Sequence, residues 1–189
     1  MGQGISCCKW LSLGLMAILL VACASSKLKA PGPDVESILV IPFQAFNSTP
    51  VPYGFSYEYQ LTAAEDPGQT YQFDLYLPGN ETFMLIDSLP PGTYYLQQVA
   101  MRRAGDGSRT GEDRAYPRND LIVLQAGKIT IFGYALFVSQ SPSGTHGGQI
   151  FWKSNFRLEH TNSAHRDRIL KKLGTMKHFG QWKVLESHG

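Results

Sequence analysis

Apolar and polar residues alternate along two segments in the first half of the chain. From Tyr53 to Leu61 every odd position is apolar or aromatic and the even positions are small or polar, and the pattern recurs from Tyr71 to Leu77. A period of two places successive side chains on opposite faces of a β-strand. Each segment is therefore predicted to be a strand with one buried face, and the turn residues at 66–68 separate the two.

Other segments are apolar without alternation. Residues 37–43 form a compact run of branched and aromatic residues, which predicts a buried strand stopped by Pro42. Further strands are predicted at residues 82–87, 93–102 and 151–158. Pro91 and Gly92 predict a type II turn, because proline sets φ at the first turn position and glycine supplies the positive φ of the second.

The period changes near the C-terminus. Ile169, Leu173 and Met176 follow one another at helical spacing, Ser163 is a candidate N-cap, and Gly174 is a candidate end. A short amphipathic helix is predicted over residues 164–173. Residues 181–185 are expected either to pack back on the body or to form an edge strand.

The turn Leu89-Pro90-Pro91-Gly92-Thr93-Tyr94 is the most specific motif of the body. A second motif spans residues 121–131. Together they resemble prealbumin-like β-sandwich modules, including carboxypeptidase regulatory-like repeats, over about residues 36–139. By this resemblance the second motif is expected to be the closing hairpin of such a module, with Ala126-Gly127-Lys128 at the turn. The resemblance implies a mainly β fold, an antiparallel β-sandwich, to which the short C-terminal amphipathic helix is added. It also implies a structural or ligand-presenting role.

The first 22 residues are organised like a signal peptide. A short polar start with Lys9 precedes an apolar run of about 13 residues, which is shorter than the roughly 20 needed to span a bilayer. The sequence Leu20-Val21-Ala22-Cys23 then resembles the lipobox of bacterial lipoproteins. The resemblance implies that the sulfur of Cys23 carries a diacylglyceryl group and that the chain is cut before it. Two alternatives are an uncleaved membrane anchor and myristoylation of Gly2.

The signal peptide, the lipobox and the strand and helix patterns divide the chain into four parts. They are a signal peptide (1–22), a lipidated tether (23–35), a β-sandwich domain (36–158) and a basic C-terminal helix and tail (159–189). Ala24 stands where an aspartate would resemble the inner-membrane retention signal. The expected location is therefore the bacterial cell envelope, at the outer membrane.

Cysteine and charge narrow the possible chemistry. The three cysteines of the 189-residue chain are Cys7, Cys8 and Cys23, so the body has no disulfide, thiol catalyst or cysteine-ligated metal. Residues 34–120 hold twelve acids and five arginines, a net charge of −7, whereas residues 153–183 hold eight Lys/Arg and two acids, a net charge of +6. The basic end either contacts an anionic partner or is a solvated surface.

No pattern of catalytic residues is present. The five histidines all lie in the last 44 residues without a His-Glu-x-x-His motif, and the serines lack a Gly-x-Ser-x-Gly motif. We therefore expect a non-catalytic protein without cofactor or metal, which joins the membrane through acyl chains on Cys23 and binds an envelope protein or glycan. Nucleic acid is excluded behind an export signal. The alternative is a carbohydrate- or peptidoglycan-binding lipoprotein that uses the aromatic residues Tyr53, Tyr76, Tyr95 and Trp152.

Overall fold

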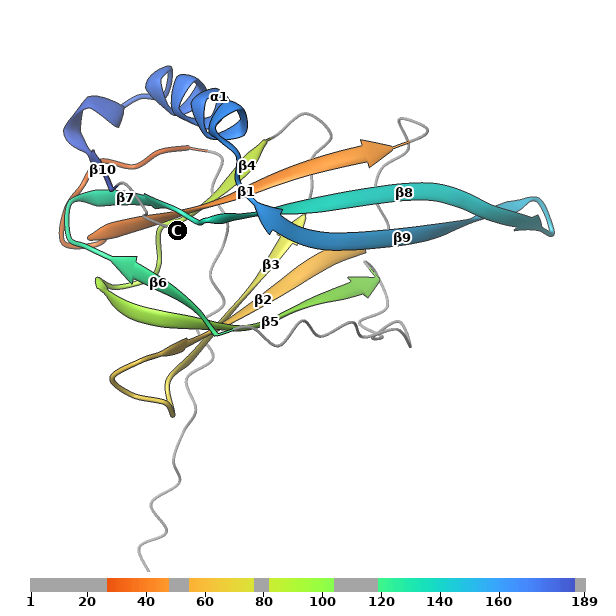
Figure 1. Ribbon diagram of the computed structural model, residues 1–189, viewed down its shortest axis with the longest axis horizontal. Coiled ribbons are helices and arrows are strands. Elements are labelled where there is room, and N and C mark those ends of the chain that lie inside the picture. Colours follow the sequence, from red (N-terminus) through yellow and green to blue (C-terminus); the bar gives the residue numbers. More distant parts are fainter. Residues whose placement is uncertain (1–26, 48–54, 77–81, 104–118, 186–189) are drawn as a thin grey trace, which may run out of the picture.

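The protein is mainly β and contains two sheets. The computed structural model describes residues 27–47, 55–76, 82–103 and 119–185, and Figure 1 shows their arrangement. The strands in these residues are β1 (Ser37–Asn47), β2 (Phe55–Ala63), β3 (Thr70–Tyr76), β4 (Phe83–Ile86), β5 (Gly92–Arg103), β6 (Asp120–Leu124), β7 (Lys128–Ile131), β8 (Tyr134–His146), β9 (Gln149–His160) and β10 (Lys183–Leu185). The helices are α1 (Ser163–Gly174) and the short 3-10 helix η1 (Phe179–Gln181).

The four-stranded sheet has the order β3-β2-β5-β6 and is antiparallel throughout. In β2 the odd residues Tyr57, Tyr59 and Leu61 are at most 1% exposed, as the alternation predicts. Two even residues, Ser56 and Glu58, are also buried. The Glu58 carboxylate accepts a hydrogen bond from the Gln72 amide of β3, which offsets the cost of burying it.

The six-stranded sheet is mixed, because β1 pairs antiparallel with β4 but parallel with both β7 and β8. At its edges β10 runs parallel to β7, and β9 runs antiparallel to β8. The expectation of a wholly antiparallel body is therefore wrong for this sheet. Parallel pairing needs a crossover connection, and the strands of the other sheet supply it, since they lie between β1 and β7 in the chain.

Pro42 does not end β1, contrary to the sequence prediction. The strand continues to Asn47. Pro42 lies between Val40, the last residue of β1 paired with β7, and Phe43, the first paired with β8. A residue without a backbone N–H is tolerated at this gap between two hydrogen-bonded ladders.

Two hydrophobic clusters lie on the two faces of the six-stranded sheet. One face shares a core with the four-stranded sheet, which includes Leu39 and Ile41 of β1 and Tyr57 and Tyr59 of β2. The other face packs under α1, where Ile38 and Val40 meet the helix residues Ile169 and Leu173. Both faces of β1 are thus buried from Ile38 to Phe43, which explains the continuous apolar run there. Figure 1 shows α1 on one side of this sheet and the four-stranded sheet on the other.

The predicted helix is present, and its cap differs from the prediction by one residue. Asn162 is the N-cap: its side-chain oxygen accepts a 2.8 Å hydrogen bond from the backbone N–H of His165. Ser163 is the first helical residue. Residues 183–185 form the edge strand β10, one of the two arrangements expected for this segment.

The two motifs of the body adopt other conformations than those predicted. Gly92 has no positive φ and begins β5, so no type II turn forms there. The motif is held instead by the Tyr94 hydroxyl, which donates a 2.7 Å hydrogen bond to the Pro90 carbonyl. The segment 121–131 is not a hairpin either, because β6 pairs with β5 in one sheet and β7 pairs with β1 in the other. Gly127, with φ of 70°, turns the chain from one sheet to the other.

Candidate functional site

Several candidate residues from the sequence lie outside the described part of the chain. These are Cys23, Tyr53 and the side chains of Tyr76 and Trp152. The fourth aromatic candidate, Tyr95, is 38% exposed on the outer face of the four-stranded sheet. Of the four aromatic residues proposed to stack on sugars, Tyr95 is the one whose side chain the structure describes. Most of the other described aromatic rings are buried in the core.

The described histidine side chains lie in three different surroundings. His165 lies in the first turn of α1 and its side chain is buried. Desolvation lowers the pKa of its imidazole, and a hydrogen bond to the backbone of Thr82 raises it. The His160 ring lies 4.3 Å from the Tyr134 ring, and His178 lies in the turn before η1. Within the described residues, no three His, Cys, Asp or Glu side chains are grouped as metal ligands would be.

The long hairpin β8–β9 is the most prominent feature of the surface. It projects beyond the rest of the body along the long axis of the molecule (Figure 1). Its tip turns at Gly147 and Gly148, with φ of 57° and 79°, between the paired residues His146 and Gln149. Two glycines with positive φ suit the tight turn that matches the twist of a hairpin.

The base of the hairpin is fixed to the core. The hydroxyls of Tyr57 on β2 and Ser154 on β9 form a 2.8 Å hydrogen bond across the two sheets. The Tyr57 ring also packs edge-on against Phe156, with ring centroids 5.5 Å apart. Burial raises the pKa of the Tyr57 hydroxyl to about 12, so the hydroxyl stays protonated at neutral pH. These contacts hold β9 against the four-stranded sheet.

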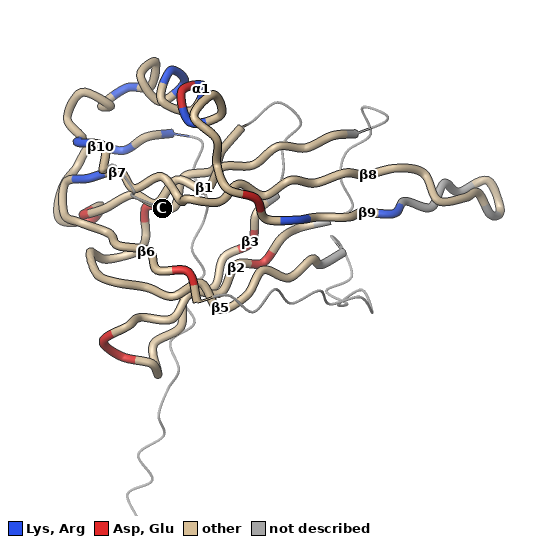
Figure 2. The backbone as a smooth tube through the Cα atoms, in the orientation of Figure 1, with Lys and Arg blue, Asp and Glu red and all other residues tan. Residues whose placement is uncertain are grey.

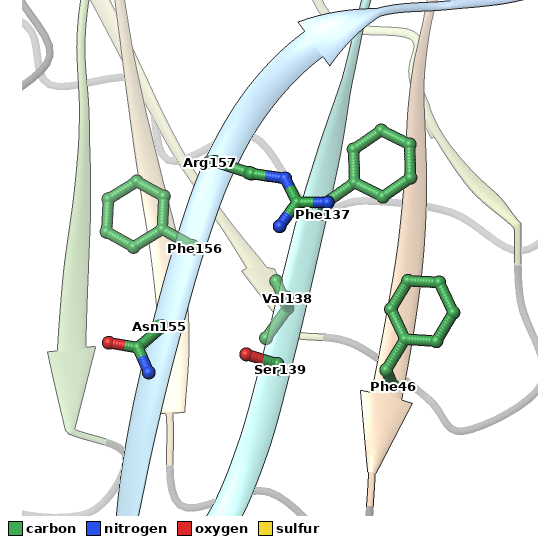
Figure 3. Close-up of a pocket in the computed structure, with 7 residues that line it drawn as sticks. All are labelled: Phe46, Phe137, Val138, Ser139, Asn155, Phe156 and Arg157. Carbon is green, nitrogen blue, oxygen red and sulfur yellow. The ribbon is translucent and has the colours of Figure 1, made fainter.

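That opposite face carries an exposed group of aromatic and cationic side chains, which we name the Phe46 patch (Phe46, Phe137 and Arg157). The rings of Phe46 and Phe137 are stacked with centroids 6.5 Å apart, and the Arg157 guanidinium carbon lies 5.5 Å from the Phe137 ring centroid. Figure 3 shows Arg157 reaching from β9 across β8 toward Phe137. The Arg157 guanidinium also donates to the carboxylate of Glu159.

The patch surrounds a small hollow of about 70 Å³. Its lining residues are Phe46, Phe137, Val138, Ser139, Asn155, Phe156 and Arg157. Pockets for small molecules usually enclose about 300–1,000 Å³, so this hollow has room for part of one side chain rather than for a sugar or a cofactor. The chemistry that it offers is non-covalent binding of an apolar group beside an anion.

The alternation of β1 explains why the patch is uncovered. Ile38 and Val40 point to the face that α1 covers, and Phe46 continues the same set of even positions past the covered region. Phe46 is 52% exposed as a result. The sequence does not predict this patch, because the apolar run from residue 37 gives no sign of where the cover provided by α1 stops.

Comparison of the chain with family models, with curated proteins and with solved structures found no match. Across the residues that the structure describes, no helix has the length and apolar character needed to cross a membrane.

Proposed function

We propose that this protein is a bacterial lipoprotein of the cell envelope, at the outer membrane, and that it works as a non-catalytic interaction module. Acyl chains on Cys23 would hold it in the membrane. The lipobox-like sequence Leu20-Val21-Ala22-Cys23 after a short apolar run supports the anchor. For the body we propose a prealbumin-like β-sandwich, a proposal supported by the core that the two sheets share.

The observation that carries the interaction role is the Phe46 patch. Monomeric proteins usually bury large aromatic side chains, and exposed aromatic and arginine residues are enriched where proteins bind one another. Phe46 is half exposed, and the ring of Phe137 is stacked beside it under a guanidinium. We infer that the partner is an envelope protein that presents an apolar side chain next to a carboxylate. The apolar group would fill the hollow, and the carboxylate would compete with Glu159 for the Arg157 guanidinium.

The anchor is tested by following the processing of the full-length chain in bacteria. Cys23→Ser should leave an uncut precursor that takes up no labelled fatty acid, because the thiol is the acceptor of the diacylglyceryl group. Cys8→Ser is the matched control and should be cut and acylated like the wild type. Normal processing of Cys23→Ser, or loss of labelling in Cys8→Ser, would contradict the lipobox assignment.

The partner surface is tested by crosslinking in intact envelopes, followed by capture of the acylated protein. Phe46→Ser should lose a crosslinked protein partner that the wild type retains. Leu121→Ser is the control, because Leu121 is an apolar side chain of similar exposure, 56% against 52%, on the other sheet. Equal loss in both variants would contradict a specific patch, and recovery of glycan without any protein would favour the carbohydrate-binding alternative.

A further inference from the structure

A second surface lies at the other end of the molecule from the hairpin tip. A groove of about 550 Å³ separates the N-terminal segment of the described chain from the turn that follows α1. Its lining residues are Lys27, Leu28, Lys29, Ala30, Met176, Lys177 and His178. Three lysines and one histidine line the groove together with apolar side chains, and none of the described lining residues is acidic. The volume is within the range of small-molecule sites and is large enough for a lipid headgroup.

Both walls of the groove are held in place. The N-terminal wall is fixed by the Trp182 indole, which donates a 2.8 Å hydrogen bond to the Lys29 carbonyl, and by the buried side chain of Leu28. The Lys29 ammonium lies 2.7 Å from the Asp87 carboxylate, so part of the positive charge of this wall is compensated. The groove therefore exists before any ligand binds.

The opposite wall is a tight turn with an unusual backbone. His178 has a φ of 72°, a conformation that residues other than glycine seldom adopt, and its carbonyl accepts a 3.0 Å hydrogen bond from Gln181. Backbone strain of this kind persists where the surrounding structure holds it and is frequent at binding sites. The turn places Lys177 at the rim, where it is exposed.

The groove is close to the proposed anchor along the chain. Lys27 follows Cys23 by four residues, and four extended residues span at most about 14 Å. If Cys23 is acylated, the groove is thus held within about 14 Å of the lipid headgroups. The charges around it are also complementary to an anionic surface, since Figure 2 shows Lys and Arg gathered along α1 and the segment around β10.

We propose that this groove and its basic rim bind the anionic headgroups of the membrane that carries the acylated Cys23. The inference rests on the proposed function, because the anchor brings the groove to the headgroups. Docking orients the body on the membrane, and the tip of the β8–β9 hairpin then lies at the far end of the long axis from β10 (Figure 1). The anchor holds the protein at the membrane, and the groove determines which side faces it.

The test measures orientation rather than attachment. The acylated protein is placed in vesicles of phosphatidylcholine alone or of equal parts phosphatidylcholine and phosphatidylglycerol, each with a quencher on the headgroups. Because no cysteine follows Cys23, Gly180→Cys introduces a single thiol for a fluorophore beside the groove, and Ser143→Cys provides the matched probe on the hairpin. We expect the probe at 180 to be quenched in anionic vesicles only, and the probe at 143 to stay unquenched in both.

Charge reversal supplies the second comparison. Lys177→Glu should weaken docking by roughly fivefold or more for each unit of charge, and the quenching at 180 should fall accordingly. Lys153→Glu makes the same change of charge on the exposed surface of β9 and should leave the quenching unaltered. Circular dichroism of both variants checks that the fold is retained.

Two results overturn the proposal. In the first, the protein floats with the vesicles, but the probe at 180 is quenched equally in neutral and anionic vesicles, or Lys177→Glu and Lys153→Glu change the quenching equally. This result removes the groove and leaves the anchor standing. The other is protein that does not float with the vesicles at all, and this result removes the anchor together with the groove.

Discussion

Replacing Ile169 by alanine tests whether α1 is an integral layer of the fold. Ile169 is fully buried between the helix and the outer face of the six-stranded sheet, next to Val40 and Ile131. The substitution removes three carbon atoms, and at about 0.8 kcal/mol for each buried CH₂ the transfer contribution is about 2.4 kcal/mol. The cavity that remains adds to it, so we expect a loss of about 3 kcal/mol or more in the free energy of unfolding.

The measurement is urea unfolding of the chain from residue 24 onward, with thermal unfolding alongside. The urea midpoint should fall while the slope stays constant, and Tm should fall by about 6–12 °C for a chain of this size. Arg168→Ala is the control, because Arg168 is the exposed neighbour on the same helix and should change stability by less than about 0.5 kcal/mol. If the two variants lose the same stability, the packing of α1 on the six-stranded sheet does not contribute to the fold as described.

Two further predictions concern single side chains. Burial lowers the pKa of His165 below its ordinary value of 6.5, so below that pH the unfolded state binds more protons and stability should fall with decreasing pH. The free energy of unfolding should change by at most about 1.4 kcal/mol per pH unit, and this dependence on pH should be weaker in His165→Gln. If the urea midpoint of His165→Gln depends on pH as that of the wild type does, His165 is not the group responsible. Tyr94→Phe removes the hydrogen bond to Pro90 and should cost about 1 kcal/mol in urea unfolding, whereas Tyr95→Phe should cost nothing; equal values refute this role for the hydroxyl.

The candidate sites differ in how far the sequence could reveal them. The lipobox is a contiguous motif, so Cys23 can be named from four neighbouring residues. The Phe46 patch joins Phe46 of β1 to Phe137 of β8 and Arg157 of β9, which lie about a hundred positions later, and the groove joins residues 27–30 to residues 176–178. Spacing along the chain carries no signal for either, because both depend on which strands and turns become neighbours.

The secondary structure follows from the sequence to a large extent. Alternation identified β2 and β3, the compact apolar run identified β1, and the helical spacing of Ile169 and Leu173 identified α1. Side-chain period is a local property that each segment carries by itself, which is why these elements can be read without the fold. The prediction of a type II turn at Pro91-Gly92 was wrong, because Gly92 begins β5 without a positive φ, and the Pro90 carbonyl accepts a hydrogen bond from the Tyr94 hydroxyl, a side-chain contact that the turn pattern does not show.

Strand pairing was decided only by the tertiary structure. Nothing in residues 121–131 distinguishes a hairpin from a chain that leaves one sheet at β6 and enters the other at β7. The parallel pairing of β1 with β7 likewise lies where both faces of β1 are buried, one by the second sheet and one by α1. The sequence by itself determined which segments are strands, which segment is the helix and which cysteine is the candidate anchor. Long-range packing determined which faces stay exposed, because exposure depends on what covers a residue and not on the residue alone.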